Sequence, residues 1–296
     1  MPPAAGGRLR DYLRALRPHH WVKNVLVFAP LVAAHETRPE LYLTAAGVFA
    51  ALSACASGTY LFNDVVDLPH DRHHPIRRHR PLAAGLIAPR PALAAGAALA
   101  AAGLGAALWL SRAAGLFVLL YLLVTVTYSL ALKRRVFADV IALAVLFTVR
   151  VVAGGAAAGV PLSPPFLAFS IFVFLALAIV KRLSELHALR AAGATEAGGR
   201  AYAAEDLIVL AGLGAAGSFA AVAVLTLYLA TPDVVERYTR PDLLWVMCLP
   251  LLYWLGRLLL LANRGAVGGD PLVFAMRDRS SWIAGAAILA VFASAL

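Results

Sequence analysis

Apolar residues form long runs separated by short polar segments, and this pattern predicts a bundle of membrane helices. Apolar stretches of membrane length fall roughly at 22–36, 41–62, 91–110, 113–132, 136–157, 165–185, 207–230, 242–262 and 281–296. A helix needs about 20 apolar residues to cross a bilayer, so the first and last stretches are short. We predict an all-α, polytopic bundle of about nine transmembrane helices. It forms a single integral-membrane domain over 1–296, with 1–17 as a basic N-terminal arm.

The composition agrees with that pattern and excludes an ordinary soluble domain. Apolar residues make up 61% of the chain and charged residues 14%, and the mean hydropathy is +0.79. Cys55 and Cys248 both fall inside apolar runs, so we expect neither a disulfide nor a cysteine metal site. Contacts between helices should use the many small residues, as in the stretch 94–107. The bilayer is the expected environment, and no nucleic-acid partner is expected.

Basic residues are unevenly distributed among the connecting segments, and this predicts the orientation. With the N-terminus inside, 21 of the 26 Lys and Arg residues fall on one side, four fall on the other, and Arg150 lies within a helix. The positive-inside rule then makes that side cytoplasmic. Residues 1–20 are basic and lack a long apolar core, so we expect no cleavable signal peptide. The prediction is a multi-pass protein of the cell (inner) membrane with its N-terminus in the cytoplasm.

An acidic motif stands directly after the second apolar stretch, on the side predicted to be cytoplasmic. Asn63, Asp67 and Asp71 are spaced by four residues, with Asp64 beside the first, so on a continuous helix they would share one face. We expect Pro69 to distort the helix between Asp67 and Asp71. Oxygen ligands in this number suit Mg²⁺, which is commonly held by one or two carboxylates together with substrate phosphates.

Basic residues follow the acids and suit the phosphates of such a substrate. Four arginines lie between residues 72 and 80, and guanidinium groups bind phosphate in two-pronged geometry. One alternative is a solvated loop in which these acids only pair with nearby arginines. Another is a transition-metal site at the histidines, which we disfavour because histidines beside phosphate-binding arginines more often act as hydrogen-bond donors. Those histidines are His70, His73, His74 and His79.

The run Asn-Asp-x-x-Asp-x-x-x-Asp, from Asn63 to Asp71, resembles the first aspartate-rich motif of the UbiA superfamily of intramembrane prenyltransferases. The resemblance implies a nine-helix bundle with a cytoplasm-facing polar cavity. It also implies Mg²⁺ bound by this motif and holding the diphosphate of the donor. Most members carry a second aspartate-rich motif after the sixth helix. Here Lys181 to His187 reads Lys-Arg-Leu-Ser-Glu-Leu-His, which has one carboxylate.

A narrower branch resembles the chain over most of its length. The decaprenyl-phosphate phosphoribosyltransferases are similar at Arg17 to Asn24, Asp71 to Gly85, Tyr128 to Lys133, Arg150 to Gly155, Lys181 to His187 and Asp270 to Arg279. This resemblance implies that phosphoribosyl diphosphate is the donor and a polyprenyl phosphate is the acceptor. The implied product is a precursor of the lipid-linked arabinose donors used in cell-wall synthesis. The resemblance also implies a homo-oligomer, with a trimer as one such assembly. Three anionic groups meeting in one cavity would require more cations than a prenyl diphosphate requires.

The predicted site follows from these residues. Asp64, Asp67 and Asp71 are the expected catalytic residues, and together with Asn63 they are the expected metal ligands. The ribose C1 would develop oxocarbenium character, as in other glycosyl transfers. The lipid phosphate is ionised near neutral pH and needs no strong base. The expected substrate-binding residues are Lys23, Asn24, Asn63, Arg77, Arg78, Tyr128, Lys133, Asp139, Arg150, Lys181, Arg182 and Glu185.

Several of these residues also have a purely structural interpretation. Lys23 could snorkel to the interface, and Lys133 belongs to a run that usually anchors a helix. A charged Arg150 inside an apolar helix costs free energy unless it is paired or faces a cavity. Asp139 is one candidate partner for Arg150, and it could instead be a second acid near the metal. Glu185 could form a helical salt bridge with Lys181. Tyr128 could be an interfacial residue.

Three classes of function therefore compete. Phosphoribosyl transfer to a lipid phosphate is our first hypothesis. Transfer of a prenyl group from a prenyl diphosphate to an aromatic or other acceptor is the second, and the missing second aspartate motif argues against it. A transporter or membrane scaffold is the third. Transporters commonly bind at the bilayer midplane within inverted repeats, whereas these acids lie at one membrane face and no repeat is evident.

Overall fold

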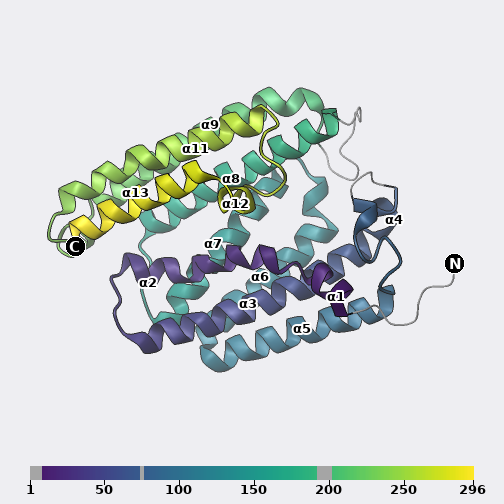
Figure 1. Ribbon diagram of the computed structural model, residues 1–296. Coiled ribbons are helices and arrows are strands. Elements are labelled where there is room, and N and C mark those ends of the chain that lie inside the picture. Colours follow the sequence, from purple (N-terminus) through teal and green to yellow (C-terminus); the bar gives the residue numbers. More distant parts are fainter. Residues whose placement is uncertain (1–8, 74–76, 192–201) are drawn as a thin grey trace. The chain divides into compact units, whose positions relative to one another are not determined.

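The computed structural model describes residues 9–73, 77–191 and 202–296, and in these ranges the chain is helical, with no β-sheet (Figure 1). The chain forms two compact units. Unit 1 comprises residues 1–135 and 149–161, and unit 2 comprises 136–148 and 162–296. We describe each unit by itself. The prediction of a single domain stays a prediction, and residues 1–8 of the predicted N-terminal arm lie outside the described ranges.

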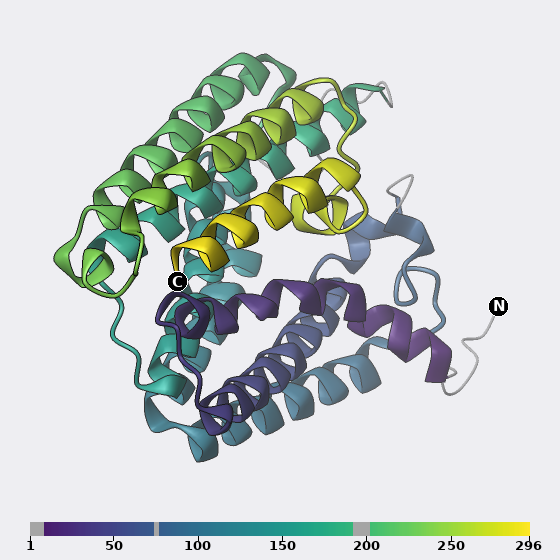
Figure 2. The same ribbon diagram turned by 60° about the vertical axis from the view of Figure 1, so that its left-hand side comes forward.

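Unit 1 is built around two long helices, α3 and α5, which lie side by side (Figure 2). A Cβ at Gly58 of α3 would collide with the carbonyl oxygen of Gly96 on α5, and a Cβ at Gly103 would lie 2.7 Å from Cys55 Sγ. Small residues let the helix backbones approach closely in this way. The helices of unit 1 are α1 Leu9–Leu16, η1 Pro18–Phe28, α2 Ala29–Ala33, α3 Pro39–Val66, α4 Leu68–Asp71, η2 Arg77–His79, α5 Pro89–Leu110, α6 Arg112–Leu130, η3 Leu132–Arg134 and the C-terminal half of α7 Ala138–Ala158.

The segment η1 is an unusually long 3₁₀ helix, since such helices rarely exceed three or four residues. It packs against α3 and against the end of α7. A Cβ at Gly154 of α7 would collide with the backbone of Val27, so glycine is required at this crossing. The first predicted helix, at 22–36, is therefore wrong in its type: it is η1 followed by the short helix α2. Close backbone packing, which hydropathy does not encode, replaces a regular α-helix here.

Unit 2 is a layered set of helices in which α8 packs on α9, α9 on α11, and α11 on α13. Asp278 caps α13 by accepting a hydrogen bond from the Ser281 amide (2.8 Å), and it forms a two-pronged ion pair with Arg257 of α11 (2.7 and 3.0 Å). The helices are α8 Pro164–Ala191, η4 Ala204–Asp206, α9 Leu207–Leu229, α10 Pro232–Val235, η5 Pro241–Met247, α11 Cys248–Asn263, α12 Pro271–Ala275 and α13 Arg279–Ala295, together with the N-terminal half of α7.

Apart from the first, the helices match the predicted apolar stretches, and they make this a multi-pass membrane protein. Within the described residues, seven helical segments are long and apolar enough to cross a bilayer, and Arg279–Ala295 is a shorter apolar helix. The count of nine spanning helices stays a prediction. Helix α8 continues to Ala191, beyond the predicted end at residue 185, so Lys181, Arg182 and Glu185 lie before its last turn and not at its end.

Candidate active site

The four residues of the acidic motif lie at the end of α3 and in the short helix after it; we call Asn63, Asp64, Asp67 and Asp71 the acidic cluster. Helix α3 ends at Val66, Asp67 is its C-cap, and α4 runs from Leu68 to Asp71 with Pro69 in its first turn. The helix is thus interrupted at Asp67, two residues before Pro69, and not between Asp67 and Asp71 as predicted. The backbone of Asp67 stays close to helical, and the Asp67 and Asp71 amides still donate to carbonyls four residues earlier.

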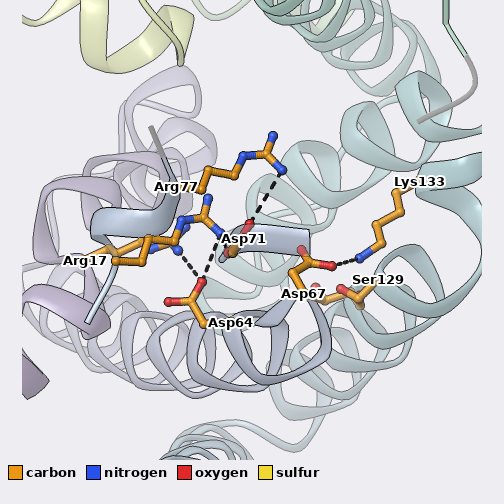
Figure 3. A network of polar contacts seen from close by, with 9 residues as sticks. Arg17, Asp64, Asp67, Asp71, Arg77, Ser129 and Lys133 are labelled. Carbon is orange, nitrogen blue, oxygen red and sulfur yellow. Dashed lines mark hydrogen bonds and ion pairs between the residues drawn. The ribbon is translucent and has the colours of Figure 1, made fainter. Parts of the chain in front are cut away.

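Two of the carboxylates share one guanidinium group. Arg80 Nη1 lies 2.6 Å from Asp71 Oδ2 and 3.2 Å from Asp64 Oδ1, so these two side chains are close together. Arg17 approaches Asp64 Oδ1 from the N-terminal segment at 2.5 Å, and Arg77 Nη1 lies 3.9 Å from Asp71 Oδ1 (Figure 3). Asp64 and Asp71 are almost completely buried. Burial of two carboxylates is tolerable here because several guanidinium groups surround them.

Asp67 lies apart from that pair and contacts a different cation. Its Oδ1 accepts from Lys133 Nζ at 2.5 Å, and Figure 3 shows Lys133 reaching toward it from beyond the end of α6. The Asp67 side chain is 26% exposed, against 2% for Asp64 and Asp71. Of the three carboxylates, Asp67 is therefore the one that solvent or a ligand reaches most directly.

Three buried oxygens of the acidic cluster have no hydrogen-bond donor among the described residues. They are Asn63 Oδ1, Asp64 Oδ2 and Asp71 Oδ1. Buried polar atoms are rarely left in this state, because each costs about 1–3 kcal/mol unless a water or an ion satisfies it. In the described ranges, no three His, Cys, Asp or Glu side chains converge on one point. The oxygens therefore suit a hard cation that takes only part of its coordination from the protein.

A second polar group of unit 1 lies deeper in the membrane region. Arg150 Nε donates to Asn24 Oδ1 (2.8 Å), its Nη2 lies 3.3 Å from the Tyr121 hydroxyl, and Asn24 Nδ2 donates to Ser53 Oγ (2.9 Å). Ser53 precedes Asp67 by 14 residues of α3, a rise of about 20 Å. The structure therefore does not bring Asn24 and Arg150 to the acidic cluster. Their contacts join η1 to α3, α6 and α7.

Unit 2 has its own charged group, which we call the ion-pair cluster: Asp139, Arg182, Glu185 and Tyr202. Arg182 of α8 is fully buried and pairs with Asp139 of α7 and with Glu185 one turn along its own helix. The Tyr202 hydroxyl donates to Asp139 Oδ1 (2.6 Å) and accepts from the Phe137 amide (2.8 Å). The predicted phosphate-binding cation Arg182 is thus already engaged by two carboxylates.

The ion-pair cluster fixes the turn that leads into α7. Phe137 has a left-handed backbone with φ of 64°, which is uncommon outside glycine, and its amide is directed to the Tyr202 hydroxyl. Burial, followed by the hydrogen bond to Asp139, raises the pKa of the Tyr202 hydroxyl. The hydroxyl therefore stays protonated and able to donate at neutral pH.

The remaining predicted substrate-binding residues differ in accessibility. Lys23 is buried in η1, Arg78 is exposed, and Arg78 Nε lies 3.4 Å from His79 Nε2. Tyr128 and Lys181 are partly buried. Their assignment as substrate-binding residues stays a prediction.

The model of the UbiA prenyltransferase family matches residues 24–277, which is most of the chain. The chain belongs to the UbiA prenyltransferase family. UbiA proteins are membrane transferases, and the same enzyme class follows for this chain.

Two relatives of this UbiA protein show how far similarity extends. Uncharacterized protein y4nM of Sinorhizobium fredii is 36% identical over the whole chain, and the match spans 58% of y4nM. Decaprenyl-phosphate phosphoribosyltransferase of Mycobacterium tuberculosis is 34% identical over 65% of this chain and 65% of its own length. Both matches thus span less than two thirds of the relative.

A solved UbiA structure supports the fold. The UbiA homolog from Archaeoglobus fulgidus bound to GPP and Mg²⁺ aligns with a TM-score of 0.72, covering 96% of this chain and 99% of that one. Identity is 17%, so this likeness concerns the fold alone. The predictions of an all-α membrane bundle and of UbiA membership are confirmed.

Arg17, Arg80 and Tyr202 contact acidic residues of the predicted site of this UbiA protein, although they were not predicted to belong to it. Arg17 and Arg80 contact the acidic cluster, and Tyr202 contacts Asp139. Arg80 stands among the four arginines that follow the acidic motif, so the sequence offered a signal but no way to choose among them. Arg17 lies 47 residues from Asp64 and Tyr202 lies 63 from Asp139, and no local spacing connects such pairs.

Proposed function

We propose that this protein catalyses the Mg²⁺-dependent transfer of a 5-phosphoribosyl group from phosphoribosyl diphosphate to a polyprenyl phosphate, with release of diphosphate. The observation that carries the proposal is the acidic cluster. It combines buried oxygens that lack a donor in the described structure with guanidinium and ammonium groups a few ångströms away. The carboxylate and amide oxygens of the acidic cluster are suitable ligands for a hard cation, and the basic groups beside them are suitable partners for phosphate. The acidic cluster could therefore hold a metal ion together with a diphosphate.

The residues fit a magnesium ion that is shared with a substrate. Mg²⁺ is usually bound by one or two carboxylates together with phosphate oxygens and water, rather than by a cage of protein ligands. Asn63, Asp67 and Asp71 would hold the cation directly. Asp64, whose Oδ1 contacts both Arg17 and Arg80, would anchor those two arginines, and its Oδ2, which lacks a hydrogen-bond donor among the described residues, would remain available to the cation. When bound, the cation supplies positive charge that stabilises the departing diphosphate.

The chain's own groups would position the reactants. Arg80, Arg77 and Lys133 lie around the acidic cluster and can turn from carboxylate to phosphate oxygens when a cation neutralises the carboxylates. An oxygen of the lipid phosphate then forms a bond to ribose C1 while the bond from C1 to the diphosphate breaks. That oxygen is already ionised, so no general base is required, and holding the two anions in place supplies much of the acceleration.

The ion-pair cluster supports this donor over a prenyl diphosphate. In the stretch Lys181 to His187, where most UbiA proteins would carry a second aspartate-rich motif, the carboxylate of Glu185 is bound by Arg182. A second all-carboxylate metal site is therefore not available from these residues. Transfer of a prenyl group remains the competing function, favoured by the family's description and by the GPP-bound structural neighbour.

The phosphoribosyltransferase of Mycobacterium tuberculosis supports the same choice by its name and its identity of 34%. We also propose that the acidic cluster faces the cytoplasm, because the connecting segments on its side carry most of the basic residues. Soluble phosphoribosyl donors and Mg²⁺ would then reach it directly.

A direct assay tests the proposal. Purified protein in nanodiscs is incubated with radiolabelled phosphoribosyl diphosphate, MgCl₂ and polyprenyl phosphate, and both lipid-extractable label and free diphosphate are measured. Equal amounts of the two products are expected, and chelation of Mg²⁺ should stop both. A parallel reaction replaces the sugar donor with a prenyl diphosphate and an aromatic acceptor. Turnover only in that second reaction would replace our proposal with prenyl transfer.

A further inference from the structure

Helix α1 has a buried face and an exposed face, and the buried face fixes its depth. Ala15, Tyr12 and Leu16 pack in a cluster with Leu61 and Val65 from the last turns of α3, and with Ala92 and Ala95 from the first turns of α5. Helices α3 and α5 are long and apolar enough to cross a bilayer, so we infer that these ends lie near its boundary. Figures 1 and 2 show α1 beside these helix ends. Helix α1 therefore lies at the level where the membrane meets water.

The exposed face of α1 combines two leucines and two arginines. Leu9 is 77% exposed and Leu13 is 50% exposed, and Arg10 and Arg14 are also exposed. In a helix the two leucines lie about 40° apart, next to the buried face, and the two arginines lie about 100° further around. At the membrane boundary this places leucines toward acyl chains and arginines toward headgroups, which is the pattern of an interfacial helix.

The end of α1 leads directly into the acidic cluster. The Leu16 carbonyl accepts from Ser57 Oγ (3.0 Å), and the next residue, Arg17, has a left-handed backbone with φ of 53°. This conformation carries the Arg17 guanidinium over the ring of Tyr60 and onto Asp64. A non-glycine residue in this region, followed by proline, costs roughly 1–3 kcal/mol and persists only when the structure around it holds it. The position of α1 is part of what holds it.

We propose that α1 is an in-plane arm that binds the anionic phospholipid headgroups of the bilayer and thereby holds Arg17 on Asp64. The occupant follows from charge complementarity: α1 carries two exposed arginines and one partly buried acid, Asp11, and so keeps a net positive charge, and two exposed leucines lie beside the arginines. A surface that carries lipid phosphates attracts such a helix. The lipid contact is independent of which donor the enzyme uses. It makes the arrangement around Asp64 sensitive to the lipid composition of the membrane.

Hydrogen exchange measured by mass spectrometry on the full-length protein tests the lipid contact. The protein is placed in nanodiscs of phosphatidylcholine alone and in nanodiscs of equal parts phosphatidylcholine and phosphatidylglycerol. We expect the amides of α1 to exchange roughly tenfold more slowly in the anionic discs, since each arginine near such a surface adds binding energy. The double variant Arg10→Gln with Arg14→Gln should lose this difference.

A matched double variant controls for net charge. Arg134→Gln with Arg135→Gln removes two exposed basic residues outside α1 and should keep the full difference. Equal exchange of α1 in the two lipid compositions would overturn the proposal, and so would a loss of the difference in the control variant. Leu9→Ser with Leu13→Ser should speed exchange of α1 in both compositions, and unchanged exchange would count against the apolar contact.

The coupling to Arg17 has a separate measurement. The His20 amide donates to the Arg17 carbonyl (2.9 Å), so its exchange reports the turn at Arg17. This amide should slow together with α1 in anionic discs. In Arg17→Gln, α1 should keep its lipid dependence while the turn loses it. If the His20 amide of the wild-type protein exchanges at the same rate in both lipid compositions, the proposed coupling between α1 and Arg17 is wrong.

Discussion

The acidic cluster and the ion-pair cluster both place carboxylates against guanidinium groups, and they differ in how completely their polar atoms are hydrogen-bonded. In the ion-pair cluster, Arg182 is bound by two carboxylates and Asp139 accepts from both Arg182 and Tyr202. In the acidic cluster, three buried oxygens have no donor among the described residues, although several cations lie nearby. Burial is similar: Asp64, Asp71, Asp139 and Arg182 are all at most 2% exposed.

The difference separates a site that can bind from one that holds the fold. A buried polar group without a partner raises the free energy of the protein, and a ligand that satisfies it recovers that energy on binding. A fully partnered cluster offers a ligand nothing comparable, since any new contact must replace an existing one. We therefore expect changes in the acidic cluster to affect activity, and changes in the ion-pair cluster to affect stability.

The largest effect is expected from Asp67→Asn. Asp67 is the most accessible carboxylate of the acidic cluster, and the change removes one negative charge from the proposed metal site. Turnover should fall about 100-fold or more. The melting temperature in detergent should hardly change, because partly exposed ion pairs such as Asp67–Lys133 contribute about 1 kcal/mol or less. The exposed Asp233→Asn serves as control and should keep both properties.

Asp139→Asn is expected to lower the stability of the protein rather than its turnover. The change removes one carboxylate of a fully buried ion pair and should destabilise the protein by about 3 kcal/mol or more. Thermal unfolding followed by circular dichroism measures this, with the exposed Glu236→Gln as control. If the variant keeps its melting temperature but loses turnover, the ion-pair cluster serves activity rather than stability, and Asp139 is a substrate-binding residue.

Much of this contrast was accessible from the sequence, and the missing part has a definite cause. Hydropathy located the helices and the spacing of the acids located the acidic cluster, and Pro69 indicated an interruption that the structure has two residues earlier, at Asp67. The assignment of Arg182 to phosphate binding rested on charge alone and overlooked Asp139, 43 residues away. Tertiary contacts determine which arginines and lysines are already paired with carboxylates. No periodic pattern in the sequence predicts these contacts. The left-handed backbone conformations of Arg17 and Phe137 could not be predicted from the sequence either, because tertiary contacts hold them.

A third variant tests whether the surroundings of η1 depend on backbone packing rather than on charge. In Gly154→Ala the new methyl group collides with the backbone of Val27, so η1 must move and carry Lys23 and Asn24 with it. We expect a loss of about 1–3 kcal/mol, as for other overpacked sites. Gly105→Ala on α5 meets nothing within 4 Å and should be neutral or slightly stabilising.

The smallest effect is expected from Tyr202→Phe, which tests the outer member of the ion-pair cluster. The change keeps the ring and removes the hydroxyl, so the Phe137 amide loses its acceptor and Asp139 loses one donor. We expect a loss of about 1–2 kcal/mol, since Asp139 still holds Arg182. Tyr228→Phe is the matched control, because its contact with Phe166 is made by the ring and does not require the hydroxyl.

The kinetic parameters of Tyr202→Phe distinguish two roles for the ion-pair cluster. If the cluster only supports the fold, kcat and KM at low temperature should equal those of the wild-type protein, with the loss confined to the melting temperature. If Tyr202 helps to direct Arg182 and Glu185 toward a substrate, KM for the donor should rise even where the protein is fully folded. The second result would mean that full partnering does not exclude a role in binding, and the distinction between the two clusters would then rest on the unpartnered oxygens alone.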